Sequence, residues 1–273
     1  MRREALVFTC AILLSLPLLA YQDTDMDGVE DTLDKCPNTP FTALADQDGC
    51  TTQSLVSPNH FDIIVGQSYS RMNDVGDTKS VAHATSLQVD YYRNNFAASI
   101  STSHYAFDTN GTRQSSGMNN TIASMSLNNR MGDTTLSTTL GAIFPTYKTG
   151  YNNETIDPFI AVGLNHSLSQ NFDLFGGYTY TLIREKDIPS TVYYNNTGAF
   201  YAGLRGTFSD SFSLSAAYNQ SDSMFVGAEK IQSASLFAYA QLTSHWFTTL
   251  STSYGLSDAA SKYDGTLRLG YYF

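Results

Sequence analysis

The densest group of metal-ligating side chains lies in a short acidic stretch near the start of the chain. Its carboxylates occupy positions one, three, five, nine and twelve of one run: Asp23, Asp25, Asp27, Asp31 and Asp34. Gly28 permits a sharp turn, and the carbonyl of Val29 falls at position seven. Carboxylates at this spacing can surround one hard cation, and Ca²⁺ binds many oxygen ligands. The pattern predicts a calcium site; a disordered acidic linker is the alternative.

The run differs from an EF-hand loop at position twelve, because Asp34 is shorter than the usual glutamate and no amphipathic helix flanks it. It resembles instead a thrombospondin type-3 repeat of the form found in OmpA-like envelope proteins. The matching positions are Asp23, Asp25, Asp27, Gly28, Asp31, Asp34, Cys36, Pro37, Thr39, Pro40, Asp46, Asp48, Gly49 and Cys50. The resemblance departs at Phe41–Ala45, where a glycine is often present, and a full second repeat is lacking.

In such repeats the aspartate-rich loops bind calcium, and a Cys-Pro pairs with a later Gly-Cys. The resemblance therefore implies Ca²⁺ as the cofactor, Asp46 and Asp48 as further ligands, and a Cys36–Cys50 disulfide. The module spans residues 21–52 and is too short to bury a core of its own, so we expect calcium and the disulfide to order it. It could then serve as a collar or as a docking arm for a periplasmic protein.

Residues 1–20 have the composition of a secretory signal peptide. Arg2 and Arg3 precede an apolar run from Leu6 to Leu19, and the small residue Ala20 suits cleavage. A retained anchor is the alternative, but the run is shorter than the roughly 20 residues that a helical span needs. After cleavage Cys36 and Cys50 are the remaining cysteines, and an oxidising compartment favours their pairing.

The end of the chain alternates between apolar and mixed positions. Leu267, Leu269, Tyr271 and Phe273 fall on one face of the expected strand, and Arg268 and Gly270 fall on the other. A strand with one lipid-compatible face is what a transmembrane β-barrel requires. The ending at Leu269, Tyr271 and Phe273 also resembles the insertion signal of bacterial outer-membrane proteins, which implies the barrel-assembly machinery as a partner.

The segment 61–273 predicts an all-β fold, a transmembrane antiparallel up-and-down barrel of twelve strands, joined to the module by a linker at 53–60. The expected strands are 61–70, 80–92, 96–107, 120–131, 135–147, 158–168, 172–183, 198–208, 212–220, 231–242, 246–256 and 263–273. Short turns alternate with longer loops, including 108–119 and 184–197, as periplasmic turns alternate with surface loops in such barrels. Aromatic residues beside the short turns predict a girdle: Tyr91, Phe96, Phe172, Trp246 and Phe247. A secreted β-sandwich is the alternative.

The expected interior is rich in hydroxyl and amide groups and poor in charge. Its charged candidates are Asp90, Arg130, Arg205 and Arg268. This favours a narrow polar pore over a strongly anion-selective one, although hydrogen-bonded side chains could also plug the lumen. The formal net charge of −10 argues against a nucleic-acid partner.

We expect no catalytic function. His166 and Ser169 are three residues apart beside a short turn, which does not match the His–Ser arrangement of outer-membrane phospholipases. The sequence favours a channel for small hydrophilic solutes in the outer membrane of a Gram-negative bacterium, in contact with outer-membrane lipid and with the acidic module in the periplasm. A structural or interaction protein with a plugged lumen is the alternative.

Overall fold

The computed structural model describes residues 25, 29, 31–39, 43–45, 47–48, 50–54, 58–72, 79–147, 155–185 and 193–273. The chain divides into two compact units, residues 1–57 and 58–273. The expected signal peptide lies outside the described residues, as do Asp23, Asp27 and Asp46. Among the described residues there is no helix of the length and apolarity needed to cross a membrane.

The first unit contains a two-stranded antiparallel sheet of β1 (Ala43–Ala45) and β2 (Thr51–Ser54). A disulfide joins Cys36 to Cys50, with an S–S distance of 2.05 Å and Cα atoms 5.1 Å apart. The predicted pairing is confirmed. The backbone of Lys35 also donates to the carbonyl of Asp48 (2.9 Å), so the turn before β1 is held against the residues before β2.

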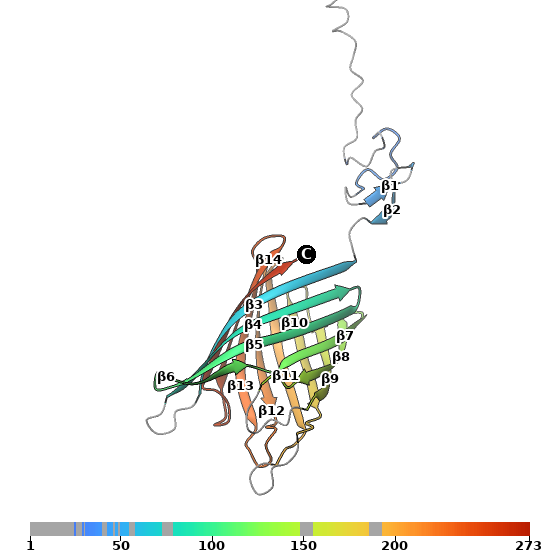
Figure 1. Cartoon of the computed structure of the whole chain (residues 1–273). Coiled ribbons are helices and arrows are strands. Elements are labelled where there is room, and N and C mark those ends of the chain that lie inside the picture. Colours follow the sequence, from blue (N-terminus) through green and yellow to red (C-terminus); the bar gives the residue numbers. More distant parts are fainter. Residues whose placement is uncertain are drawn as a thin grey trace, which may run out of the picture. The chain divides into compact units, whose positions relative to one another are not determined.

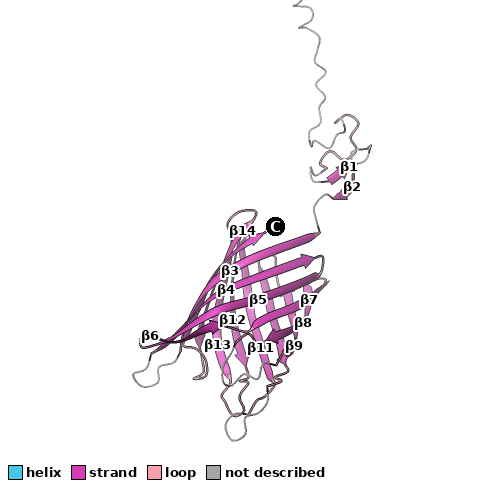
Figure 2. Cartoon of the chain, viewed as in Figure 1, coloured by secondary structure: helices cyan, strands magenta, loops and turns pink. Residues whose placement is uncertain are grey.

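The second unit is a closed antiparallel barrel of twelve strands (Figures 1 and 2), as the sequence predicts. The strands are β3 (Asn59–Arg71), β4 (Ser80–Arg93), β5 (Phe96–Thr109), β7 (Thr121–Met131), β8 (Thr134–Phe144), β9 (Asp157–Ser167), β10 (Phe172–Thr181), β11 (Thr197–Ser209), β12 (Phe212–Ser221), β13 (Ile231–Gln241), β14 (Trp246–Gly255) and β15 (Tyr263–Tyr272). Each strand pairs with its neighbours in the chain, and β15 pairs with β3 to close the ring.

Closure brings the two ends of the barrel sequence together. Leu269 lies opposite Val65, Tyr271 lies opposite Ile63, and the backbone N–H of Phe273 donates to the carbonyl of Phe61 (2.9 Å). The last strand therefore satisfies the backbone groups of the first, and neither remains a free edge.

One expected loop is a hairpin. Residues 108–119 continue β5 to Thr109, turn at Asn110-Gly111 and return as β6 (Thr112–Met118), which pairs with β5. Asn110 and Gly111 both have positive φ (47° and 77°), and Asn-Gly accommodates a two-residue turn that matches strand twist. The prediction of a loop here was wrong because the Asn-Gly pair was read as a loop composition and not as a hairpin turn.

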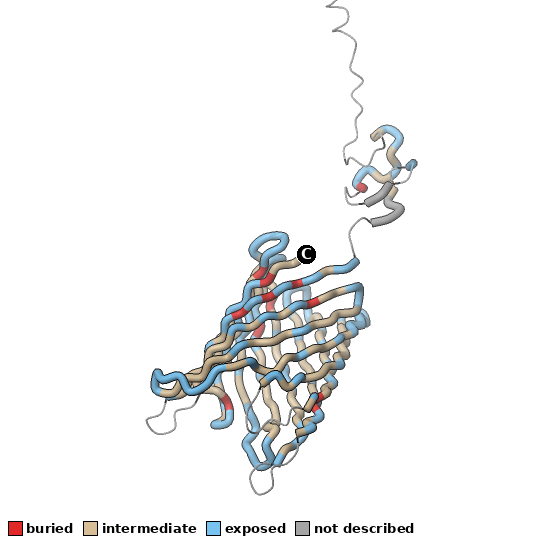
Figure 3. The backbone as a smooth tube through the Cα atoms, viewed as in Figure 1, coloured by how far each residue is buried: buried red, intermediate tan, exposed pale blue. Residues whose placement is uncertain are grey.

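The barrel has hardly any apolar core among its described residues. Three apolar residues are buried, Ile64, Phe247 and Ala260, while large apolar side chains such as Met125 and Phe208 (both 63% exposed) cover the outside. Figure 3 accordingly shows few buried positions along the strands. The prediction of Phe247 in the outer girdle was wrong: Trp246 points outward, so the next residue on a strand points inward.

Candidate functional site

Two cavities lie in the described part of the barrel interior. The first, about 410 Å³, is lined by side chains of β8 to β13, and the second, about 430 Å³, by side chains of β3, β4, β5, β7 and β15 and by Tyr147 after β8. Because every strand alternates its side chains, most of the residues that line the first cavity are spaced by two along a strand, as Ser215, Ala217 and Asn219 are on β12. The interior side chains therefore leave space inside the barrel.

Aromatic rings in the first cavity lie against glycines of the neighbouring strand. Phe175 on β10 is paired with Gly203 on β11, and Tyr201 on β11 is paired with Gly177 on β10. A Cβ at Gly203 would lie 2.7 Å from the Phe175 ring, and one at Gly177 would lie 2.7 Å from the Tyr201 hydroxyl. The two glycines thus provide the room that lets the rings lie along the wall. Phe247 has the same relation to Gly270.

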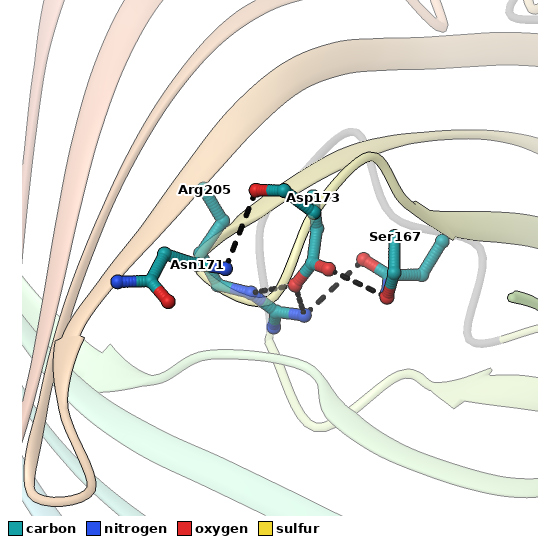
Figure 4. Close-up of polar contacts among 6 residues, drawn as sticks. Ser167, Asn171, Asp173 and Arg205 are labelled. Atoms are coloured by element: carbon teal, nitrogen blue, oxygen red, sulfur yellow. Dashed lines mark hydrogen bonds and ion pairs between the residues drawn. The ribbon is translucent and has the colours of Figure 1, made fainter.

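A salt bridge fixes the main charge of the first cavity. Arg205 donates to Asp173 Oδ2 from Nη2 (2.6 Å) and Nε (3.0 Å), and Nη2 also donates to Asn165 Oδ1 (3.2 Å). Ser167 donates to the other oxygen of Asp173 (2.8 Å), and Figure 4 shows this network. Nearby, the backbone N–H of Thr207 donates to the carbonyl of Asn171 (2.8 Å). The guanidinium is therefore held between β9, β10 and β11 with its charge matched.

Two acids face each other on β3 and β4. Asp62 and Asp90 are cross-strand partners, and both are buried (8% and 5% exposed). Gln88 Nε2 donates to both carboxylate oxygens of Asp90 (2.8 and 3.0 Å), and Tyr92 lies near enough to interact with both acids. Asp62 Oδ1 is buried without a hydrogen-bond partner. This pair is the strongest concentration of negative charge that the described part of the interior presents.

The second cavity is more polar than the first. Arg268 lines it, and its Nη1 lies 3.5 Å from Gln88 Oε1, the acceptor end of the amide that donates to Asp90. On the other side Asn119 Nδ2 donates to Ser103 Oγ (2.8 Å). Arg268, Gln88 and Asp90 thus form a chain of polar side chains on β15 and β4.

The four charged residues that the sequence singled out have different surroundings. Arg205 and Arg268 line separate cavities, and Asp90 is buried in the wall. Arg130 lies at the end of β7, where its Nε donates to the carbonyl of Gly132 in the following turn (3.2 Å). Sequence reasoning missed Asp62 and Asp173, whose inward positions could have been read from strand parity.

In the acidic module, five of the eight expected calcium ligands are described: Asp25, Val29, Asp31, Asp34 and Asp48. Asp25 Oδ2 accepts from the backbone of Thr39 (2.7 Å), while its Oδ1 is buried and accepts no hydrogen bond, which fits an oxygen that ligates a cation. Asp34 Oδ1 accepts from Cys36 N (2.7 Å), and Asp48 forms a salt bridge with Lys35 (2.9 Å). No cluster of three or more ligating side chains occurs among the described residues, so the calcium site stays a prediction.

No hydrogen bond joins His166 to Ser169, both of which the structure describes. His166 Nδ1 lies 2.9 Å from the hydroxyl of Thr134, and the Ser169 hydroxyl accepts from the backbone of Asn171 (3.4 Å). Neither side chain lines either interior cavity.

No protein-family model matches the sequence. Among solved structures, the fold is similar to an outer membrane channel from Pseudomonas putida F1, with a TM-score of 0.65 and 12% identity over 80% of this chain and 97% of that one. It is also similar to the NanC porin, with a TM-score of 0.51 and 11% identity over 77% of this chain and 97% of that one. The KdgM porin in complex with disordered oligogalacturonate likewise has a TM-score of 0.51, with 9% identity over 78% of this chain and 98% of that one. At these identities the similarity establishes that the chain shares their β-barrel fold.

Proposed function

We propose that the protein is an outer-membrane channel for small hydrophilic solutes in a Gram-negative bacterium. The observation that carries the proposal is the contrast between an apolar outer surface and a polar interior with two unfilled cavities. A soluble barrel would bury its apolar residues inside, whereas this chain exposes them on the outside. The similarity to solved porins supports the same reading.

The outer surface has the features of a lipid-facing belt. Outward residues of neighbouring strands are apolar and exposed, including Leu140, Leu164, Leu204 and Leu250. At the end of the barrel where β15 finishes, aromatic side chains pack against one another. The ring centroids of Trp246 and Tyr271 are 4.9 Å apart, and those of Tyr271 and Phe273 are 4.8 Å apart. Aromatic residues at this depth are typical of the interface between lipid and water. The closed sheet leaves no barrel edge exposed to the lipid.

The charges of the interior favour weak ion selectivity. Arg205 is neutralised by Asp173, and Arg268 lies across Gln88 from the acids Asp62 and Asp90. With both signs present and no row of like charges along the described strands, we expect similar permeability for small cations and anions.

The decisive experiment is single-channel conductance in planar bilayers with a matched pair of variants. Ala217 lines the first cavity, and Ala216 on the same strand faces outward. Ala217→Phe should reduce the conductance because the added ring fills the lumen, whereas Ala216→Phe should leave it unchanged. A correctly folded wild-type barrel without conductance, or equal effects of the two variants, would contradict the channel function.

An interaction protein of the outer membrane is the second candidate, favoured by β6. Its residues are exposed except for Gly117, and in the described sheet β6 has β5 as its single neighbour. Such an edge can accept an extended segment of another protein. In the register of β5 and β6, the backbone N–H of Ser116 faces away from β5, because Asn119 donates to Ser103 and hydrogen-bonded pairs recur every second residue. If this function holds, Ser116→Pro should abolish surface adhesion by whole cells, because proline removes this edge N–H, and conductance should not change. Adhesion equal to that of the wild type would count against it.

We propose further that the acidic module binds Ca²⁺ and acts as a periplasmic docking arm. The buried, unpaired Oδ1 of Asp25 supports this assignment. Calorimetric titration of the full chain with CaCl₂ should give a binding isotherm that Asp25→Asn weakens and that Asp210→Asn, an acid in a barrel turn, leaves intact. The absence of binding by the wild type would overturn the proposal.

The end of β15 is also proposed to be recognised by the barrel-assembly machinery, through Leu269, Tyr271 and Phe273. Deletion of Phe273 should then lower the amount of folded barrel in cells, measured by heat-modifiable gel mobility, while refolding into detergent in vitro remains possible. Equal losses in both settings would indicate a purely structural role.

A further inference from the structure

We infer that the first cavity is a binding subsite for a neutral saccharide, seated with an apolar face of its ring on Tyr201, in the cavity that Phe175 and Phe237 also line. The inference deepens the proposed channel function and rests on it, because a solute reaches these residues through the lumen. Its volume of about 410 Å³ is within the roughly 300–1,000 Å³ typical of small-ligand sites.

The cavity presents aromatic surface to water. Tyr201 and Phe237 line it and remain 40% and 42% exposed, although each belongs to an inward-facing row of its strand. Outward-facing rings would contact lipid. Rings inside a polar lumen have no lipid to contact, so their apolar faces stay in contact with water. A solute with an apolar face would cover that area.

The arrangement of the rings is built into the backbone. Tyr201 lies over Gly177 and reaches toward Gly163 on the next strand, where a Cβ would lie 3.3 Å from its hydroxyl. Phe175 lies over Gly203, and the Phe175 and Tyr201 ring centroids are 6.2 Å apart. A ring that lies along the wall in this way presents its other face to the cavity. The two rings, whose planes are inclined at 44°, therefore line adjoining parts of the wall and form the aromatic platform of the cavity.

The polar groups around the platform select for an uncharged ligand. The charge of Arg205 is matched by Asp173, so the cavity has no unbalanced charge among its described lining residues. Asn219 Nδ2 on β12 donates to Ser235 Oγ on β13 (2.9 Å), and both side chains line the same cavity as Arg205. Hydroxyl and amide groups of this kind exchange hydrogen bonds readily with sugar hydroxyls.

The combination identifies the ligand class. A pyranose ring has one face of C–H groups for the aromatic platform and hydroxyls around its rim for the amides. A flexible polyol has the hydroxyls but no rigid apolar face. A sugar acid has both but adds a charge that the matched Arg205–Asp173 pair does not balance.

The test is saturation-transfer NMR on the detergent-solubilised protein, with sucrose, maltose, lactose and cellobiose as probes. Sorbitol and glucuronate are the polyol and charged controls. We expect at least one disaccharide to bind and both controls to bind more weakly. Tyr201→Leu should weaken that binding roughly tenfold, as expected for the loss of one aromatic stacking contact. Tyr218→Leu, which removes an outward-facing tyrosine, should not change it.

Parallel conductance measurements separate this inference from the proposed function. A conducting wild-type channel to which no disaccharide binds better than sorbitol would overturn the subsite and leave the channel intact. Equal binding by the Tyr201→Leu and wild-type proteins would also overturn it. A barrel that binds the disaccharide but never conducts would overturn the channel function instead.

Discussion

Among the described residues neither unit of this chain has a large apolar core, and each unit is stabilised internally in a different way. The barrel closes its backbone hydrogen bonds into a ring, with β15 paired to β3, and keeps its large apolar side chains outside. The described part of the module has one short sheet and one disulfide, with Lys35 bonded to Asp48. Backbone closure requires a long chain with a regular repeat, whereas a short segment depends on cross-links.

The disulfide offers the largest expected difference between the units. Replacing Cys36 and Cys50 by serine removes a cross-link between residues 14 apart, which costs the module about 3 kcal/mol on the chain-entropy estimate. The barrel should be unaffected because no strand of it is cross-linked. Limited proteolysis should then cleave residues 31–54 faster while heat-modifiable mobility of the barrel stays the same. Slower folding or lower stability of the barrel would contradict the independence of the two units.

A glycine in the barrel tests whether close contact between ring and backbone contributes to its stability. Gly270→Ala would place a Cβ about 2.1 Å from the Phe247 ring, so the ring must move. We expect a loss of about 1–3 kcal/mol, as for overpacking elsewhere, measured by urea unfolding in detergent. Adding Phe247→Ala should relieve the clash, so the Gly270→Ala/Phe247→Ala protein should show no additional loss over Phe247→Ala alone. Gly265→Ala is the control, since nothing lies within 4 Å of its Cβ position.

The salt bridge in the lumen should affect selectivity more than stability. Arg205→Gln leaves Asp173 without its cation, and because the Arg205 side chain is 40% exposed, the loss of stability should be below about 1 kcal/mol. The uncompensated acid should shift the reversal potential toward cation selectivity. Asp173→Asn should shift it toward anions. Shifts of the same sign in both variants would refute the assignment of a matched pair.

The smallest expected effect is at a loop of the barrel. Hydrogen bonding to Lys230, with a further bond from the backbone of Gly198, lowers the pKa of Asp222 below its usual value of 3.8. Because the folded-state pKa is depressed, the contact contributes stability above pH 4 and loses it as the pH falls through the folded pKa. NMR titration should show Asp222 protonating below free aspartate, and Lys230→Gln should move the midpoint upward. An unchanged midpoint would exclude the lysine as the cause.

The strand pattern of the barrel could be read from the sequence because it depends on neighbours along the chain. The final strand illustrates this: Leu267, Leu269 and Tyr271 alternate with Arg268 and Gly270, and the structure pairs this strand with β14 and β3. Parity also gave the inward position of Arg205. The hairpin turn at Asn110-Gly111 also depends only on adjacent residues, and the Asn-Gly pair in the sequence was a sufficient signal for it.

Other features depended on which residues lie opposite one another, and no local pattern gives that. Phe175 lies over Gly203 and Tyr201 over Gly177 because of the register between β10 and β11. Asp62 meets Asp90, and Asp173 meets Arg205, for the same reason. A shift of one residue in any pair would separate them, since it moves every side chain of a strand to the other face.

The sequence by itself determined that this chain is an all-β barrel with twelve strands, a lipid-compatible exterior and a disulfide between Cys36 and Cys50. Alternation, turn composition and cysteine number are properties of single segments, so they are visible without a structure. The tertiary structure decided that the described interior contains two cavities, that Arg205 is neutralised by Asp173 and that Phe175 and Tyr201 lie along the wall. These depend on inter-strand register and on the closure of the sheet, which bring together residues far apart in the chain.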